Sequence, residues 1–319
     1  MRILRHYRDV PAAGRGTVAA LGNFDGVHLG HRALLMEAAR LAQEKGALFA
    51  VFVFEPYPRE FFRPDGDPFR LTPFRAKARL LEEIGADVLL VFPFDAALAG
   101  TSSEDFVLKI LVEELEVKHV VVGEDFRYGK GRAGDATTLA YMGEMEGFGV
   151  TTLPHLTDGE GTKISSSRIR SALRDGKPDE ATRYLGHWWS VEAHVSEGDK
   201  RGRTLGFPTA NLKLDGTLSP VFGVYAVRAY IRGLGQPHDG VANYGVRPTF
   251  EIPAPLLEVH LFDFVGDLYG QLLRVELISY LRPEVKFDAL EALKSQLAAD
   301  RDAAKAALTS NATVPTLDP

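Results

Sequence analysis

Two patterns of apolar residues alternate along the first half of the chain. Short apolar runs, typical of buried strands, fall at 17–22, 47–54, 87–92, 118–122 and 149–153. Between them, apolar residues recur every three or four positions and predict helices at 31–45, 74–84, 103–115 and 136–146. Ser102, three residues before Asp105, predicts a capping box for the third helix. Alternating strands and helices indicate an α/β domain with a parallel sheet, which binds ligands at the carboxyl ends of its strands.

After residue 185 the pattern changes. Two short helices are expected just before this point, up to Arg174 and from Asp179 to Leu185. From 188 to 280 apolar and polar residues alternate with period two, and β-branched and aromatic residues predominate, which predicts a closed antiparallel barrel. Asp288 then predicts the cap of a final helix to about Leu308, followed by a frayed tail over 309–319. We therefore expect two domains, 1–185 and 186–319.

Composition narrows the class of protein. Hydrophobic content of 45% and charged content of 25% are typical of a soluble globular protein, and the net charge of -6 argues against broad nucleic-acid binding. The chain has no cysteine, which excludes disulfides and thiolate catalysis and fits the cytoplasm. Charged residues interrupt the first nine positions, so a signal peptide is not expected. No apolar run approaches the ~20 residues that a membrane span needs.

The segment Gly22–His31, with the sequence GNFDGVHLGH, joins the first predicted strand to the first predicted helix. A helix N-terminus favours phosphate, Gly30 lets a ligand approach, and His28 and His31 add donors that can become cationic. A zinc site is one alternative, but no cysteine or neighbouring cluster completes it, and a packing or capping histidine is another. The segment lacks the glycine patterns of Walker loops and dinucleotide binders. It favours a nucleoside triphosphate.

A second phosphate-binding pattern lies at the start of a later helix. Ser165, Ser166 and Ser167 supply hydroxyls there, and Arg168 and Arg170 supply guanidiniums. A hydroxyl in this place commonly caps the helix, which accounts for at least one of the three. Arginines in the first turns oppose the helix dipole, so charge-assisted bonds to phosphate would explain them.

The second domain carries candidates of its own. Gly198–Gly202 is a basic loop whose N–H groups can bind phosphate, although a plain hairpin loop would look the same. Thr209 and Asn211 alternate onto one side of an extended segment, and two oxygen ligands suit a hard cation such as Mg²⁺. Glu258 lies in an otherwise apolar strand, where a carboxylate is either paired structurally or catalytic.

Five segments in order resemble those of the prokaryotic bifunctional riboflavin kinase/FAD synthetase family. They are Gly22–His31, which contains the His-x-Gly-His signature of nucleotidylyltransferases, Gly123–Gly129, Ile164–Arg170, Gly202–Asn211 and Glu258–Gly270. Three residues depart from the family pattern: Tyr57, Tyr128 and Ser167 stand where the family usually has His, Phe and Thr. The missing imidazole at Tyr57 leaves open whether that position contacts phosphate.

The resemblance implies an N-terminal Rossmann-like nucleotidylyltransferase domain and a C-terminal β-barrel riboflavin kinase domain with a terminal helix. In the first domain the FMN phosphate would attack the α-phosphate of ATP, giving FAD and pyrophosphate with Mg²⁺ present. The residues expected to bind that ATP are Gly22, Phe24, His28, Gly30, His31, Asp125, Arg127, Ser165, Ser166, Ser167, Arg168 and Arg170. For Asp125 and Arg127 the alternative is an ordinary loop with a buried Phe.

In the barrel, the terminal hydroxyl of riboflavin would attack the γ-phosphate of a second ATP, and Glu258 would accept its proton. Thr209 and Asn211 would hold Mg²⁺. The residues expected to bind phosphate are Gly198, Lys200, Gly202, Arg203 and Thr209. Phe62 and Tyr128 are the candidate flavin contacts.

Two other functions would fit parts of the sequence. A single-activity adenylyltransferase would have been favoured by loss of Thr209, Asn211 or Glu258, and all three are present. A flavin-storage protein would not need the phosphate-binding histidines. The expected partners are riboflavin, FMN, FAD and ATP, with no nucleic acid or membrane, and self-association is compatible with the sequence.

Overall fold

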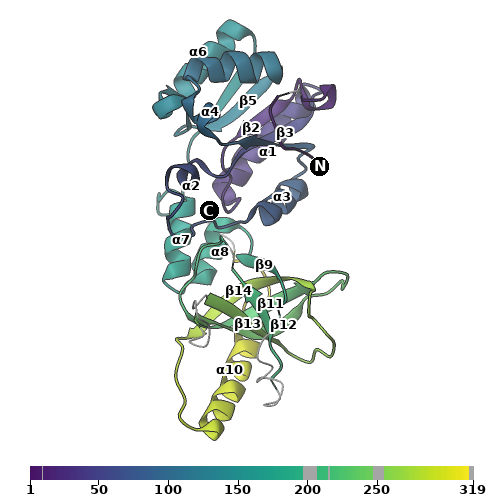
Figure 1. Ribbon diagram of the computed structural model, residues 1–319, viewed down its shortest axis with the longest axis vertical. Coiled ribbons are helices and arrows are strands. Elements are labelled where there is room, and N and C mark those ends of the chain that lie inside the picture. Colours follow the sequence, from purple (N-terminus) through teal and green to yellow (C-terminus); the bar gives the residue numbers. More distant parts are fainter. Residues whose placement is uncertain (9, 197–206, 215, 247–254, 316–319) are drawn as a thin grey trace. The chain divides into compact units, whose positions relative to one another are not determined.

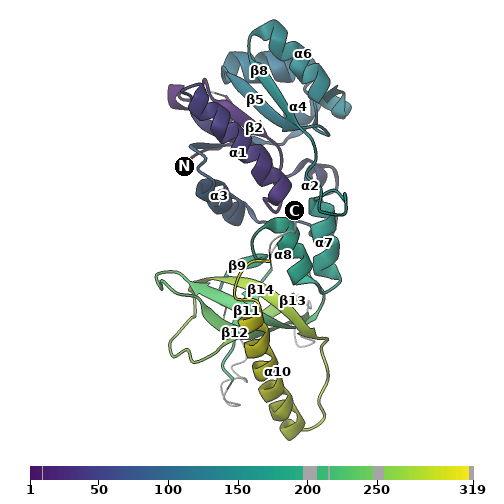
Figure 2. The same cartoon turned by 180° about the vertical axis from the view of Figure 1, so that it is seen from behind.

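The computed structural model describes residues 1–8, 10–196, 207–214, 216–246 and 255–315. The chain divides into two compact units (Figures 1 and 2). Unit 1 comprises Met1–Asp67 and Thr72–Ile164, and unit 2 comprises Pro68–Leu71 and Ser165–Pro319. Within the described ranges, no helix combines the length and the apolar character that crossing a membrane would require.

Unit 1 is built on a six-stranded sheet in which all paired strands are parallel. Its spatial order is β1 (Arg2–Leu4), β4 (Val88–Pro93), β3 (Phe49–Glu55), β2 (Val18–Leu21), β5 (His119–Gly123) and β8 (Gly149–Leu153). The central strands are buried on both faces, which explains why they appear in the sequence as continuous apolar runs. The α/β prediction is confirmed.

Helices cover both faces of this sheet (Figure 1). On one face, α1 (Leu29–Glu44) and α3 (Phe74–Glu83) pack against residues such as Val18 and Val51. On the other face, η2 (Phe106–Glu114) and α6 (Ala136–Glu146) pack against alternate residues of the same strands. The side chains of each strand therefore divide between two separate cores.

Some elements differ from the expected ones. Ser102 caps α5 (Ser103–Asp105) by accepting the Asp105 N–H at 3.0 Å, but the helix continues as the π-helix η2. Nine residues are too few for apolar spacing to separate π from α geometry. The sequence also gave no signal for several elements of two to five residues: β1, η1 (Ala12–Gly14), α2 (Pro58–Phe62), α4 (Ala96–Gly100), β6 (Arg127–Tyr128), η3 (Lys130–Arg132) and β7 (Gly134–Asp135).

Unit 2 contains the predicted antiparallel barrel. Its strand order is β10 (Ala210–Lys213), β13 (Pro255–Leu261), β12 (His238–Val246), β11 (Gly223–Ile231), β14 (Leu272–Arg282) and β9 (Ser190–His194). A bridge between Ser196 and Asn211 links the residues after β9 to β10, so the sheet is nearly closed. The unit also contains α7 (Ser166–Arg174), α8 (Pro178–Leu185) and α10 (Leu290–Ser310).

The C-terminal region is more ordered than expected up to residue 315, and residues 316–319 of the predicted tail lie outside the described residues. Ala289, not Asp288, is the N-cap of α10, and it makes no side-chain cap bond. The helix runs to Ser310, and Ala304 and Leu308 pack in a core with Val224 of the barrel. Arg228 donates to the carbonyls of Leu308, Asn311 and Ala312, so the residues just after α10 are held rather than frayed.

Candidate active sites

The first site lies where the strand order of unit 1 reverses. The chain leaves β2 for β3 on one side and reaches β5 on the other, and β2 pairs with both in parallel. The segments that follow β2 and β5, Gly22–His28 and Glu124–Phe126, therefore leave the sheet at the same edge. Such a switch point is where open parallel sheets bind their ligands.

His28 and His31 stack on one another at this edge. Their ring centroids lie 3.6 Å apart with planes 17° from parallel. His28 is also the N-cap of α1, because its Nδ1 accepts the backbone N–H of His31 at 3.3 Å. An accepting Nδ1 carries a lone pair, so the proton of a neutral His28 ring sits on Nε2. One histidine thus both caps the helix and keeps a donor.

The structure gives a reason for glycine at position 30 that the sequence did not reveal. A Cβ at this position would lie 3.2 Å from Cε1 and 3.3 Å from Nδ1 of His28. Any side chain there would press on the imidazole that caps α1. The glycine of His-x-Gly-His therefore leaves room for the first histidine as well as for a ligand.

The turn between β2 and α1 has an unusual backbone. Phe24 and Val27 are buried non-glycine residues with φ of 49° and 44°. The ring of Phe24 lies beside Gly22 and meets His31 edge-on at 5.3 Å. Residues other than glycine rarely adopt a positive φ unless surrounding contacts hold the backbone in that conformation. Such backbone strain is typical of functional turns.

The loop after β5 is fixed by charges of its own unit. Lys163 Nζ donates to Asp125 Oδ2 at 2.8 Å, and His155 Nε2 lies 3.6 Å from the same oxygen. Partial burial raises the pKa of Asp125, but the hydrogen bond and charge of Lys163 outweigh it, and the pKa is lowered. Arg127 is exposed and donates to the carbonyl of Phe126.

The two candidate flavin contacts differ in exposure. Phe62 is 66% exposed at the end of α2. Tyr128 is only 5% exposed, packs between Phe106 and Phe126, and would be struck by a side chain at Gly134. Phe62 is therefore the more accessible of the two candidates, and flavin contact by either ring stays a prediction.

The Ser165–Arg170 segment belongs to unit 2, where it forms the start of α7. Ser165 is the N-cap, accepting the Arg168 N–H at 3.4 Å, as the capping alternative predicted for one of the three serines. The Arg168 guanidinium lies over the Tyr184 ring at 4.3 Å. Arg170 Nε donates to the Phe69 carbonyl at 2.8 Å. Both arginines therefore have structural contacts, and phosphate binding stays a prediction.

The second site is a row of polar residues on the barrel. Glu258 of β13 is directly opposite Asn211 of β10 on one side and Asn243 of β12 on the other. Residues directly opposite one another point to the same face of a sheet, so the three side chains are neighbours. Asn243 Nδ2 donates to Glu284 Oε1 at 2.9 Å, which adds a second carboxylate beside the row.

Asn211 has the feature expected of a metal ligand. The residue is 4% exposed, and its Oδ1 has no hydrogen-bond partner among the described residues. A buried amide oxygen without a donor is costly, and a hard cation would satisfy it. With Thr209 two residues away and the Glu258 carboxylate opposite, the residues present fit Mg²⁺.

A cavity lies beside Thr209, at the start of β10. Thr209 and Ala210 form part of its wall, together with apolar residues of β13 and with Asp267 and Tyr269. The remaining predicted phosphate ligands, Gly198, Lys200, Gly202 and Arg203, lie outside the described residues. Because Ala210 and Val259 alternate with Asn211 and Glu258 along their strands, the cavity lies against the opposite face of the sheet from this row. Thr209 is the predicted ligand that borders it.

Comparison with known proteins identifies the family. A model of FAD synthetase matches residues 10–168, and a model of riboflavin kinase matches residues 185–308. The bifunctional riboflavin kinase/FMN adenylyltransferase of Escherichia coli is 43% identical over 302 residues, covering 94% of this chain and 96% of its own. The chain belongs to the bifunctional riboflavin kinase/FMN adenylyltransferase family.

Other relatives agree with this assignment. The bifunctional riboflavin kinase/FMN adenylyltransferase of Pseudomonas fluorescens is 42% identical over 307 residues, covering 96% of this chain and 97% of its own. A crystal structure of a Streptococcus pneumoniae protein named macrolide-efflux protein covers 95% of this chain and 98% of its own, with TM-score 0.84 and 31% identity. The name macrolide-efflux protein is that of the Streptococcus protein alone, and its structure shows that the two chains share a fold.

Within this bifunctional family, the departure at Tyr57 acquires a structural explanation. Tyr57 is 2% exposed, and its hydroxyl contacts Lys77 at 3.0 Å and Asp25 at 3.3 Å. Sequence reasoning overlooked Lys77, although the residue lies on the apolar stripe of α3 that includes Ala78 and Leu81. A lysine among apolar residues at helical spacing is unusual, and this signal could have identified Lys77 from the sequence.

Proposed function

We propose that this chain carries out two successive reactions. It transfers the γ-phosphate of ATP to riboflavin, giving FMN and ADP, and it then joins FMN to the adenylyl group of a second ATP, giving FAD and pyrophosphate. The observation that carries the proposal is the consecutive match of an FAD synthetase model and a riboflavin kinase model, with full-length bifunctional relatives. We assign adenylyl transfer to 1–185 and phosphorylation to 186–319.

In the kinase reaction, we assign Glu258 as the general base. Its carboxylate takes the proton of the riboflavin hydroxyl as the oxygen attacks the γ-phosphate and ADP leaves. Thr209 and Asn211 would hold Mg²⁺, which neutralises phosphate charge when bound. The cavity beside Thr209 is our candidate for the ATP, and the segment with Gly198, Lys200, Gly202 and Arg203 is predicted to bind its phosphates.

In the adenylyl transfer, the nucleophile is the FMN phosphate, which is already anionic, so no base is needed. The protein must instead offset the negative charge that builds up at the α-phosphate. We assign this task to His28, His31 and the N–H groups at the start of α1, which the switch point brings to the ligand-binding edge. Ser165–Arg170 is predicted to bind phosphate in the same reaction, and Phe62 to contact the flavin.

The metal ion, the cellular location, the partners and self-association are also proposals. We expect Mg²⁺ in both steps and a location in the cytoplasm. Riboflavin, FMN, FAD and ATP are the expected small-molecule partners. Self-association is an expectation that sedimentation of the purified chain would test.

One assay tests the proposed function. The purified protein is incubated with riboflavin, ATP and Mg²⁺, and the flavins are separated by chromatography over time. We expect FMN to appear first and FAD afterwards, with one pyrophosphate released per FAD. Flavin that binds without being converted would instead indicate a storage protein, and FMN without FAD, or FAD from added FMN only, would indicate a single activity.

A further inference from the structure

Lys77 is a cation enclosed by protein. It lies on α3, its side chain is 0% exposed, and it faces the interior beside Ala78 and Leu81. Charged groups are rarely buried unless they are paired and hydrogen-bonded, because removal from water is strongly unfavourable. A buried lysine in an otherwise apolar helix face therefore calls for a specific role.

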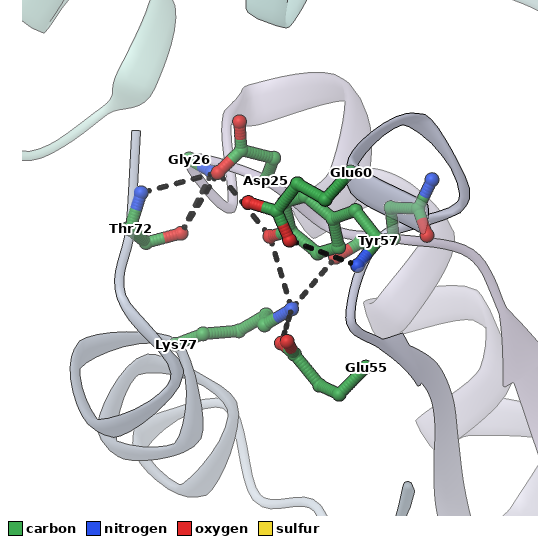
Figure 3. A network of polar contacts seen from close by, with 8 residues as sticks. Asp25, Gly26, Glu55, Tyr57, Glu60, Thr72 and Lys77 are labelled. Carbon is green, nitrogen blue, oxygen red and sulfur yellow. Dashed lines mark hydrogen bonds and ion pairs between the residues drawn. The ribbon is translucent and has the colours of Figure 1, made fainter. Parts of the chain in front are cut away.

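The contacts of Lys77 are shown in Figure 3. Its Nζ donates to Glu55 Oε1 at 3.0 Å, to the Tyr57 hydroxyl at 3.0 Å and to the carbonyl of Asn23 at 3.2 Å. The ammonium also lies 4.3 Å from the centroid of the Tyr57 ring. These contacts connect α3 to the end of β3 and to the turn after β2.

Tyr57 and Thr72 extend the network to Asp25. The Tyr57 hydroxyl donates to Asp25 Oδ1 at 3.3 Å, and the same oxygen accepts from the N–H of Thr72 at 3.1 Å. The Gly26 N–H in turn donates to the Thr72 hydroxyl at 3.0 Å. Asp25 is 4% exposed, so its charge is balanced by these donors and by the nearby ammonium rather than by water.

Three of the residues held in this way, Asn23, Asp25 and Gly26, belong to the turn between β2 and α1. They lie next to Phe24 and Val27, the two non-glycine residues of that turn with positive φ. A backbone in this conformation persists only when its surroundings fix it. The network supplies that fixation on the side of the turn that faces the interior.

We propose that Lys77, Tyr57 and Asp25 are positioning residues for adenylyl transfer. They preset the turn so that His28 and the first N–H groups of α1 meet the ATP phosphates without rearrangement. This inference rests on the proposed function of the His28 site. Lys77 is not itself a phosphate ligand, since its ammonium is fully enclosed and already donates to Glu55, Tyr57 and Asn23.

Presetting has a kinetic signature. If the network is weakened, only a fraction of molecules holds the competent turn, and the apparent affinity for ATP falls by that fraction. Saturating ATP selects the competent form and restores the rate. A positioning role therefore raises the KM for ATP and leaves kcat nearly unchanged, whereas loss of a catalytic group lowers kcat.

The test uses two variants and a matched control in the full-length protein. Lys77→Met removes the ammonium, and Tyr57→Phe removes only the hydroxyl that joins Lys77 to Asp25. Lys109→Met is the control, because Lys109 is 65% exposed and pairs with Asp105 on the surface of unit 1. Conversion of FMN to FAD is measured against ATP concentration, and phosphorylation of riboflavin by the same samples reports on the intact barrel.

We expect the KM for ATP in FAD formation to rise roughly tenfold in Lys77→Met and about threefold in Tyr57→Phe, with kcat within about twofold. Lys109→Met and the kinase reaction should not change. If Lys77→Met fails to fold, Tyr57→Phe decides. An unchanged KM, or a fall in kcat alone, in folded Tyr57→Phe would overturn the inference. A wild-type protein that makes no FAD would overturn the proposed function, and the inference with it.

Discussion

At the scale of single residues, each site depends on a direct neighbour. His28 caps α1 through Nδ1, stacks on His31, and needs the absence of a side chain at Gly30. Glu258 has an amide opposite it on each side, Asn211 and Asn243. The groups that we assign to chemistry are therefore oriented by residues two or three positions away along the chain or directly across a strand pair.

The first prediction concerns Glu258. Replacing it by Gln keeps the shape of the side chain but removes its ability to accept a proton. We expect riboflavin phosphorylation to fall by ~10²–10⁴-fold, while conversion of added FMN to FAD continues. Both rates are measured on one preparation, with Glu291→Gln, a change at an exposed residue of α10, as control. Near-normal phosphorylation in folded Glu258→Gln would make Glu258 a structural residue.

Sequence reasoning found the residues whose spacing is unusual and missed those whose partners are distant. His28, His31 and Glu258 were singled out because a paired imidazole and a carboxylate in an apolar strand are conspicuous locally. The contact of Lys77 with Glu55 joins residues 22 positions apart, and that of Tyr57 with Asp25 joins residues 32 apart. The burial of Tyr128, a candidate flavin contact, could not be predicted, because Phe106 and Phe126 reach it from other elements.

At the scale of elements, one ion pair joins the middle of α10 to the barrel. Arg282 at the end of β14 donates from Nε and Nη2 to the two oxygens of Asp300, each at 2.7 Å, and Gln296 adds a bond at 2.9 Å. Asp300 is 5% exposed. The hydrogen bond to Asp300 raises the pKa of Arg282, in keeping with a stable pair. This pair fixes the middle of α10 against the barrel.

The second prediction is that Asp300→Ala destabilises unit 2 by about 2 kcal/mol, because two charge-assisted bonds are lost and Arg282 keeps a partly buried charge. The chain has two tryptophans, Trp188 and Trp189, both in unit 2. Urea denaturation followed by tryptophan fluorescence therefore reports on that unit. The control, Asp302→Ala, removes an exposed pair with Arg301 and should change the free energy of unfolding by less than ~0.5 kcal/mol. Equal effects of the two variants would contradict the assignment.

The long elements were predictable, and their ends were not. The strands and helices predicted for unit 1 appeared close to their expected positions, because both faces of the sheet are buried. The predicted N-cap of α10 was wrong: Asp288 lies one residue before the observed N-cap, Ala289. The prediction arose because the spacing from Asp288 to Glu291 matches that of a capping box. The end of α10 was underestimated because Arg228, which holds it, comes from a distant strand.

At the scale of the whole molecule, the change of pattern along the chain predicted a parallel sheet followed by a barrel, and both are present. It could not show that Pro68–Leu71 belongs to unit 2. There, Leu218 donates to the Arg70 carbonyl, and Trp189 Nε1 donates to the Leu71 carbonyl from 118 positions away. No local pattern marks four residues whose partners are so distant.

The central claim is that two activities reside in separate sets of residues on one chain. Glu258→Gln should disable only the kinase. His28→Asn should disable only adenylyl transfer, because Asn keeps the cap of α1 but loses the imidazole donor; we expect at least a tenfold loss. The third prediction is therefore that each variant alone completes one reaction, and that the two together complete both.

The most direct measurement mixes equal amounts of the two folded variants with riboflavin, ATP and Mg²⁺ and follows FAD by chromatography. We expect Glu258→Gln alone to leave riboflavin unchanged and His28→Asn alone to stop at FMN. The mixture should make FAD, since FMN released by one variant is adenylylated by the other. Absence of FAD from the mixture, or substantial FAD from either variant alone, would contradict the account.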